Sequence, residues 1–93
     1  MPWVRGFIWD EENMEHVAQH QVSPEEVEEA LTGDPLVLRG PDGRYLAYGK
    51  TSSGRHLFAV YVSQARGRVR VLTAREMTEK ETRLYRRRRK GRT

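Results

Sequence analysis

The chain has 93 residues, which is enough for one domain with one modest hydrophobic core. It has no cysteine, so disulfides and thiolate metal sites are excluded, and no apolar run reaches the roughly 20 residues of a membrane span. The first ten residues also lack the pattern of a secretory signal peptide. We therefore expect a single domain over residues 1–93 that resides in the cytoplasm.

Charge is distributed unevenly along the chain, although the net charge is only +4. Residues 1–38 hold one basic and nine acidic residues, a sum of −8, whereas residues 39–93 hold sixteen basic and four acidic residues, a sum of +12. Such asymmetry indicates that the basic part meets nucleic acid or an acidic protein. The alternative is that the two parts neutralise each other within the fold.

The N-terminal third is predicted to be helical. Residues 7–9 form a short apolar run that is a candidate first strand, and Asp10 follows as an N-cap. The next apolar residues recur at helical spacing, which predicts an amphipathic helix over residues 11–20. Its expected apolar face consists of Met14, Val17 and Ala18.

A second helix is marked by stronger start and stop signals. Ser23 and Glu26 have the spacing of a capping box, with Pro24 in the first turn. Gly33 is expected to end the helix as a left-handed cap, and Pro35 follows two residues later.

From residue 35 onwards the pattern changes to short strands separated by turns rich in Gly, Pro and Ser. Strands are predicted over residues 36–38, 44–50, 55–63 and 68–75. The third is apolar nearly throughout, which indicates burial on both faces, and Tyr61 in its middle is expected in the core. In the fourth, Val69, Val71 and Thr73 should face one way.

A C-terminal helix is predicted to open at Thr78, because Glu81 completes a capping box three residues later. It continues as a basic tail over about residues 79–93. Consecutive strands joined by short turns pair antiparallel. The expected fold is α+β: two N-terminal helices packed on an antiparallel meander of about four strands, followed by a C-terminal basic helix.

Few groups in the chain could carry chemistry. His16 and His20 share a helix face, but no third ligand accompanies them, so no metal site is predicted. General acid or base catalysis by one of these two histidines is a better prediction than metal binding, because histidine titrates near neutral pH. For His16, capping of carbonyls at the helix end is the alternative role. Phosphate loops, Ser-His-Asp arrangements and carboxylate pairs are missing from the sequence. Arginines interleaved with tyrosines remain, and these residue types bind phosphates and stack on bases.

Several motifs occur in a characteristic order: WDEEN at 9–13, VSPEEVEEAL at 22–31, GDPL at 33–36, GRHLFAVY at 54–61 and TAREMTEKETRLY at 73–85. In this order and spacing the chain resembles the BrnT-type toxins of type II toxin–antitoxin systems. The resemblance implies a RelE-like fold and an endoribonuclease that needs neither metal nor cofactor, cuts RNA and inhibits translation. It also implies a small ribbon-helix-helix antitoxin (BrnA-like) as partner, with DNA contacted only through the antitoxin complex.

The resemblance also implies site residues. His20 matches a catalytic histidine, although Gln19 and Gln21 stand where the family has lysine and glycine. Arg55 and Arg75 would hold the phosphate, and Tyr85 would assist or stack on a base. The residues expected to position the RNA backbone are Arg44, Lys50, Arg68, Arg70, Arg83, Arg86 and Arg87.

Two other functions remain open from the residues alone. One is a non-catalytic module that binds nucleic acid in a salt-dependent way. The other is a protein-interaction domain whose basic face binds only an acidic partner.

Overall fold

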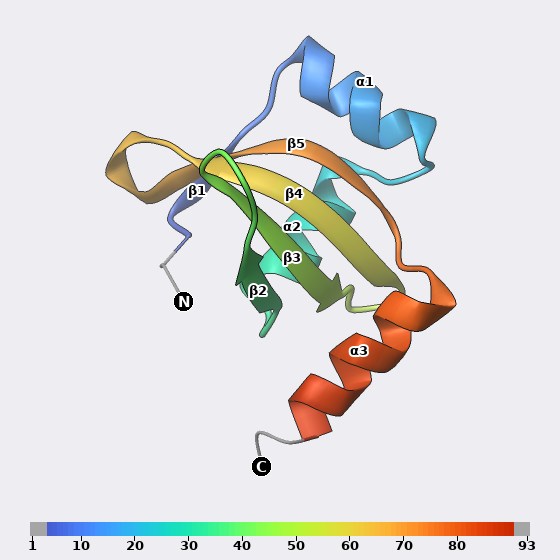
Figure 1. The fold of residues 1–93 in the computed structure, drawn as a ribbon. Coiled ribbons are helices and arrows are strands. Elements are labelled where there is room, and N and C mark those ends of the chain that lie inside the picture. The colour runs from blue at the N-terminus through green and yellow to red at the C-terminus, as the bar shows by residue number, and fades with distance from the viewer. Residues whose placement is uncertain (1–3, 91–93) are drawn as a thin grey trace.

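The structure, a computed structural model, describes residues 4–90; residues 91–93 of the expected basic tail lie outside the described part. Three helices and a five-stranded sheet make up the described chain (Figure 1). Its elements in order are β1 (Gly6–Ile8), α1 (Glu11–Gln19), α2 (Pro24–Thr32), β2 (Leu36–Arg39), β3 (Arg44–Lys50), β4 (His56–Ser63), the 3₁₀ turn η1 (Ala65–Gly67), β5 (Arg68–Glu76) and α3 (Glu79–Lys90). The α+β class is thus confirmed.

The sheet has the strand order β1-β5-β4-β3-β2. Strands β2 to β5 form the expected antiparallel meander. β1 adds to it in parallel alongside β5, so the sheet is mixed rather than purely antiparallel. The parallel pairing arises because α1 and α2, not a tight turn, follow β1 along the chain.

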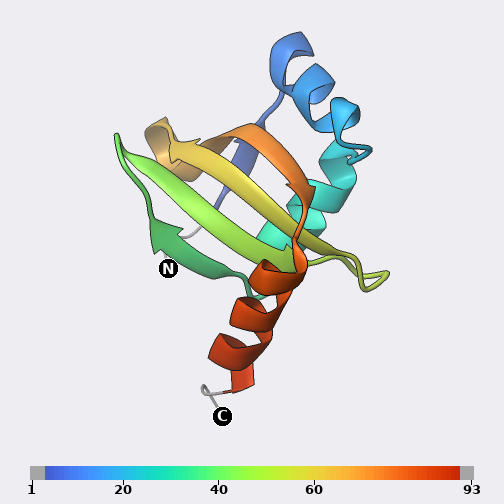
Figure 2. The same cartoon turned by 45° about the vertical axis from the view of Figure 1, so that its right-hand side comes forward.

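Helices α1 and α2 cover one face of the sheet, α1 on β5 and α2 on β3 and β4. The core between these layers includes Val17, Val27, Leu57, Tyr61 and Val71, each at most 2% exposed. The core position expected for Tyr61 is therefore confirmed. Helix α3 contacts β2 and β3 and lies at the end of the sheet remote from the β4–β5 turn (Figures 1 and 2).

The buried side of α1 differs from the expected apolar face. Met14 and Ala18 are exposed, and Asn13 is buried beside Val17. The Asn13 amide nitrogen donates to the carbonyl oxygens of Ile8 (2.8 Å) and Val71 (3.0 Å), while its amide oxygen accepts from the backbone N–H of Asp10 (2.8 Å). Because its polar atoms are all bonded, this amide can replace an apolar residue in the core.

Three further expectations are wrong in detail. Gly33 has φ −73° and is not a left-handed cap; α2 ends because Pro35 cannot continue it. β4 alternates between buried and half-buried residues, because α2 packs against one of its faces whereas α3 contacts chiefly β2 and β3. A register shift between Val60 and Tyr61 breaks the alternation in β5, so that Ala74 rather than Thr73 continues the buried face.

Candidate functional site

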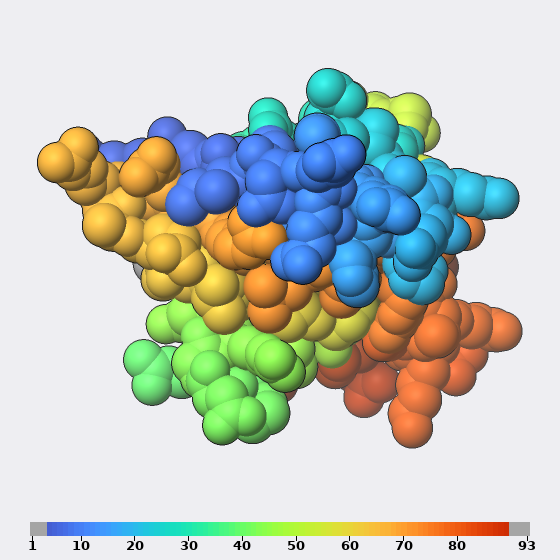
Figure 3. Space-filling view, turned by 90° about the horizontal axis from the view of Figure 1, so that it is seen from above, coloured from blue at the N-terminus to red at the C-terminus, as the bar shows by residue number. Residues whose placement is uncertain are grey.

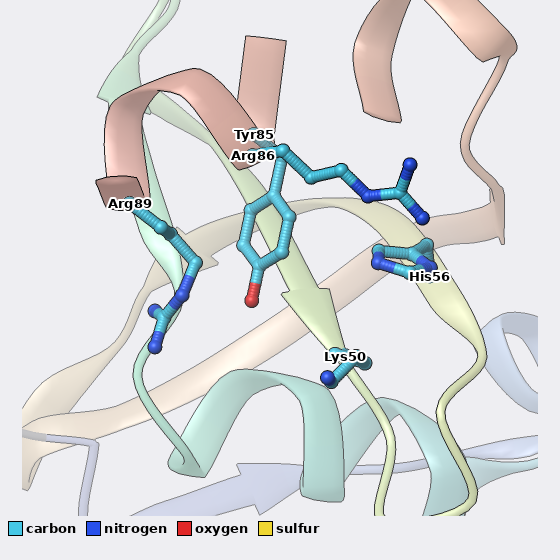
Figure 4. Close-up of a pocket in the computed structure, with 5 residues that line it drawn as sticks. All are labelled: Lys50, His56, Tyr85, Arg86 and Arg89. Carbon is cyan, nitrogen blue, oxygen red and sulfur yellow. The ribbon is translucent and has the colours of Figure 1, made fainter. Parts of the chain in front are cut away.

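A hollow of about 290 Å³ lies where α3 approaches the ends of β3 and β4. Its lining consists of Lys50, His56, Tyr85, Arg86 and Arg89, and we call it the α3 pocket. In Figure 4 the Tyr85 ring stands in the middle, with Arg89 on one side and His56 and Arg86 on the other. Lys50 lies towards the hydroxyl end of the ring.

Backbone pairing explains why these residues meet. Lys50 ends β3 and His56 begins β4, and the two are cross-strand partners, so their side chains lie on the same face. Tyr85 and Arg89 are four residues apart on α3 and therefore share one side of the helix. The rings of His56 and Tyr85 meet edge to face with centroids 5.7 Å apart, and the Arg89 guanidinium lies 5.4 Å from the Tyr85 ring centroid.

The pocket combines positive charge with a neutral imidazole. Burial lowers the pKa of His56, and the charges of Arg86 and Lys50 lower it further, so the ring is neutral at pH 7 and has one nitrogen free to accept a proton. Among the described residues, Lys50 and Arg86 have no acidic partner, whereas Arg89 pairs with Asp34 at 3.0 Å. Tyr85 is only 5% exposed.

Arg75 lies on the same side of the sheet and holds the start of α3. Two of its nitrogens bond the two carboxylate oxygens of Glu81 at 2.8 and 2.9 Å, and its guanidinium lies 4.5 Å from the Phe58 ring centroid. Glu81 also accepts from the backbone N–H of Thr78 (2.8 Å), which confirms the predicted capping box. Hydrogen bonding from Arg75 lowers the pKa of Glu81, so the pair is ionised at neutral pH.

Arg55 forms a separate network on the helix-covered side. It donates to Glu76 (2.9 Å), to Glu26 of α2 (2.9 Å) and to the backbone carbonyl of Gln21 (2.8 Å). Hydrogen bonding to Glu76 contributes most to raising the pKa of Arg55. Its positive charge is therefore already shared between two carboxylates.

His20 lies next to this network as the exposed C-cap of α1. His20 thus precedes the residue whose carbonyl Arg55 binds, whereas Tyr85 lines the α3 pocket and Arg75 binds the first turn of the same helix. Arg75 and Glu76 are successive strand residues and point to opposite faces, which separates the Arg55 network from the α3 pocket. The four expected catalytic residues do not form a single constellation.

Comparison with known proteins identifies the family. A family model described as "Ribonuclease toxin, BrnT, of type II toxin-antitoxin system" matches residues 9–81. The chain belongs to the BrnT family. A search of curated proteins finds no match. The crystal structure of the Brucella abortus ribonuclease toxin BrnT is similar at 18% identity, with a TM-score of 0.65, covering 80% of this chain and 97% of that one, and this likeness shows the fold.

Membership in the BrnT family implies RNA as the target and a cognate antitoxin as the partner. No helix within residues 4–90 is long and apolar enough to cross a membrane. The same residues contain no group of three or more His, Cys, Asp or Glu side chains that could hold a metal ion.

One departure from the expected BrnT pattern places a non-glycine residue in a left-handed backbone conformation. Gln21 stands where the resemblance places glycine, and it adopts φ 61°, a left-handed conformation that glycine takes without strain. Its carbonyl is nevertheless held by Arg55. The loop between α1 and α2 therefore keeps a shape suited to glycine with a larger residue in it.

The expected RNA-binding residues of this BrnT chain fall into three groups. Lys50 and Arg86 line the α3 pocket, and Arg44, Arg68 and Arg87 are exposed with no acidic partner in the described part. Arg70 pairs with Asp10 and with Glu12 (3.2 Å), and Arg83 pairs with Glu79 (3.1 Å). The last two arginines are thus already occupied by carboxylates.

His56 and Arg89 were missed by reasoning from the sequence alone. A polar residue at the start of an otherwise apolar strand was the available signal for His56. Its partners come from β3 and α3, so only the strand register and the placement of α3 show the pocket.

Proposed function

We propose that the chain is a metal-independent endoribonuclease whose reaction centre is the α3 pocket, and that it acts in the cytoplasm by cutting RNA and so inhibiting translation. The observation that carries the proposal is the contact of a neutral His56 with Tyr85 in a pocket. The other residues that line this pocket are the cations Lys50, Arg86 and Arg89. This arrangement offers a proton acceptor, a hydroxyl donor and positive charge within one small hollow.

The proposed reaction uses the 2′-hydroxyl of the RNA as nucleophile. His56 accepts the 2′-hydroxyl proton, and the 2′-oxygen forms a bond to phosphorus. The bond from phosphorus to the 5′-oxygen breaks, and that oxygen takes a proton from Tyr85. The products are a 2′,3′-cyclic phosphate and a 5′-hydroxyl, and solvent returns the proton from His56 to Tyr85. Lys50 and Arg86 stabilise the negative charge that builds on the phosphate oxygens.

The lining of the pocket supports metal independence. Mg²⁺ is held chiefly by carboxylate and carbonyl oxygens. The described side chains that line the α3 pocket are cationic nitrogens, one imidazole and one phenol, and the neighbouring carboxylate of Asp34 is paired with Arg89. The chain's own cations therefore take the place that a divalent ion would have beside the phosphate.

Arg75 and Arg55 have supporting roles in this proposal. Arg75 fixes the first turn of α3 through Glu81 and so places Tyr85 one turn further along. Arg55 joins the α1–α2 loop to α2 and to the end of β5. The alternative location for catalysis is His20 beside Arg55, and it is tested by the same experiment.

The proposed partner is a ribbon-helix-helix antitoxin, which would neutralise the toxin and bind DNA for the complex. Membership in a type II toxin family supports an antitoxin as such. Co-expression with a neighbouring small gene, followed by purification of the complex, tests its type.

The decisive experiment incubates labelled single-stranded RNA with purified protein in excess EDTA. The parent protein should cleave, and His56→Gln should lose about 10²- to 10⁴-fold in rate, the usual contribution of a general base. His16→Gln is the matched control for the α3 pocket, because His16 is an exposed histidine on α1, which packs on the opposite face of the sheet. Loss in His20→Gln with full activity in His56→Gln would move the centre to the α1–α2 loop. Intact RNA with salt-sensitive binding would instead indicate a non-catalytic binding module.

A further inference from the structure

Unpaired arginines gather at the end of the sheet opposite the α3 pocket. We call this set the arginine rim: Arg5, Arg39, Arg44, Arg66 and Arg68. All five are exposed, and none has an acidic partner in the described part of the chain. The one acidic residue nearby in sequence is Asp42, in the turn between β2 and β3.

Strand direction brings the rim together from distant parts of the chain. Arg39 ends β2 and Arg44 begins β3, while Arg68 begins β5 directly after the turn that carries Arg66. Because β1 runs parallel to β5, Arg5 reaches the same end, where its N–H donates to the Gly67 carbonyl at 2.7 Å. Seen from above, the β2–β3 and β4–β5 turns project on one side and α3 lies on the other (Figure 3).

The unpaired state of the rim sets it apart from other arginines of the fold. Arg55, Arg70 and Arg75 each bind at least one carboxylate and tie helices to the sheet. No ion pair within the described residues uses the guanidinium groups of the rim, so pairing inside the fold does not account for their charge. Five cations left free at one end attract a polyanion.

Resting on the proposed function, we propose that the arginine rim is a second RNA-binding site, which holds the backbone of the same single strand that is cut in the α3 pocket. The two sites are separated by the length of β4, about 25 Å at ~3.3 Å per residue. Between them the sheet face carries the half-buried cross-strand pair Leu46 and Val60, against which bases can lie. The rim therefore selects RNA long enough to span the sheet.

Composition favours RNA over a protein at the rim. A stable protein interface needs an apolar centre, with aromatic residues enriched. The turns of the rim are instead built from Gly, Pro, Asp, Gln and Ala, and the one large apolar side chain exposed within the described residues, Met14, lies on α1. A phosphate backbone needs only charge and hydrogen-bond donors.

The test compares substrates of two lengths. A rim variant, Arg5→Gln with Arg39→Gln and Arg66→Gln, is assayed on a dinucleotide and on a single strand of about 10 nucleotides, within the usual range of single-strand site sizes. We expect KM for the long RNA to rise roughly 10- to 100-fold with kcat unchanged, and the dinucleotide to be cleaved as by the parent. Lysine at the same three positions is the control, which keeps the charge and should restore KM to within a few-fold.

Salt dependence gives a second readout that does not need cleavage. Affinity is measured for the long RNA with a 2′-deoxy group at the cut site, so that it binds but does not react. Losing three phosphate contacts should reduce the slope of log affinity against log salt by about 2, since each contact contributes about 0.7 for a single strand.

Other outcomes separate the possible failures. Equal effects on both substrates, or no effect on either measurement, would overturn the rim as a length-selecting site. Unchanged RNA affinity with weakened binding of the purified antitoxin would assign the rim to an acidic protein partner instead. If the parent cleaves neither substrate, the proposed reaction is wrong. The binding measurement still shows whether the arginine rim binds RNA.

Discussion

The Arg75–Glu81 pair provides the sharpest test of how the α3 pocket is built. A double-mutant cycle of Arg75→Gln, Glu81→Gln and the double variant isolates the energy of the pair. Glutamine at position 81 is a matched change, because Gln can replace Glu in a capping box and so preserves the start of α3. Each single substitution removes one charge, the double variant removes both, and the helix cap is kept throughout.

The expected coupling follows from the geometry of the pair. Two parallel hydrogen bonds of 2.8 and 2.9 Å join side chains that are 35% and 21% exposed. Hydrogen bonds to charged groups contribute about 1.5–3 kcal/mol when buried, and exposed ion pairs about 0–1 kcal/mol. A half-buried pair should therefore show a coupling of about 1–2 kcal/mol. For a domain of this size, Arg75→Gln should lower Tm by roughly 4–16 °C.

Thermal unfolding followed by circular dichroism measures the coupling, and RNA cleavage by the same proteins measures its effect on the pocket. If Arg75 acts by fixing α3, Glu81→Gln should lose as much cleavage as Arg75→Gln. A coupling below about 0.3 kcal/mol, the error of such cycles, would refute the anchoring role. Full activity in Glu81→Gln with none in Arg75→Gln would instead mean that Arg75 contacts the phosphate.

Two further predictions concern the pocket histidine and the packing of α2. The folded state holds the pKa of His56 below its unfolded value of about 6.5, so the unfolded state binds more protons between the two values, and the unfolding free energy falls as pH drops through that window. Tm of the parent should therefore fall more than that of His56→Gln on going from about pH 7.5 to about pH 5, and parallel curves would contradict the buried neutral ring. A Cβ on Gly49 would lie 2.2 Å from the backbone oxygen of Ala30, so Gly49→Ala should cost about 3 kcal/mol or more in a urea titration. Gly33→Ala, with its nearest neighbour at 3.6 Å and a negative φ, should change stability by less than about 1 kcal/mol.

Local signals explain the parts of the fold that the sequence predicts well. The capping boxes at Ser23 and Thr78 need only four consecutive residues, and both helices start where those boxes place them. The strand over residues 44–50 also has the predicted bounds, because turns rich in Gly, Pro and Ser flank it. Short-range chemistry alone sets these boundaries.

Long-range contacts explain the rest. Asn13 replaces an apolar residue because a carbonyl of β5, 58 positions away, accepts from its amide. The register shift in β5 cannot be read from its regular alternation of valine and arginine. The α3 pocket depends on both effects at once, since His56 acquires its neighbours from another strand and from the last helix. Arginine content alone does not distinguish a structural arginine such as Arg55 from a free one.

The basic residues in the described part of the chain have two roles: some form ion pairs with acids of the N-terminal third, and others remain unpaired at the two ends of the sheet. Acids of the N-terminal third pair with arginines of the C-terminal part and fasten helices to the sheet, as Glu26 does with Arg55 and Asp10 with Arg70. This pairing neutralises the middle of the molecule and leaves positive charge at the two ends, in the α3 pocket and at the arginine rim. Charges separated by about 25 Å interact weakly with each other at physiological salt, where the screening length is about 8 Å. A flexible strand of RNA can bind both ends at once, and a compact anion can bind only one.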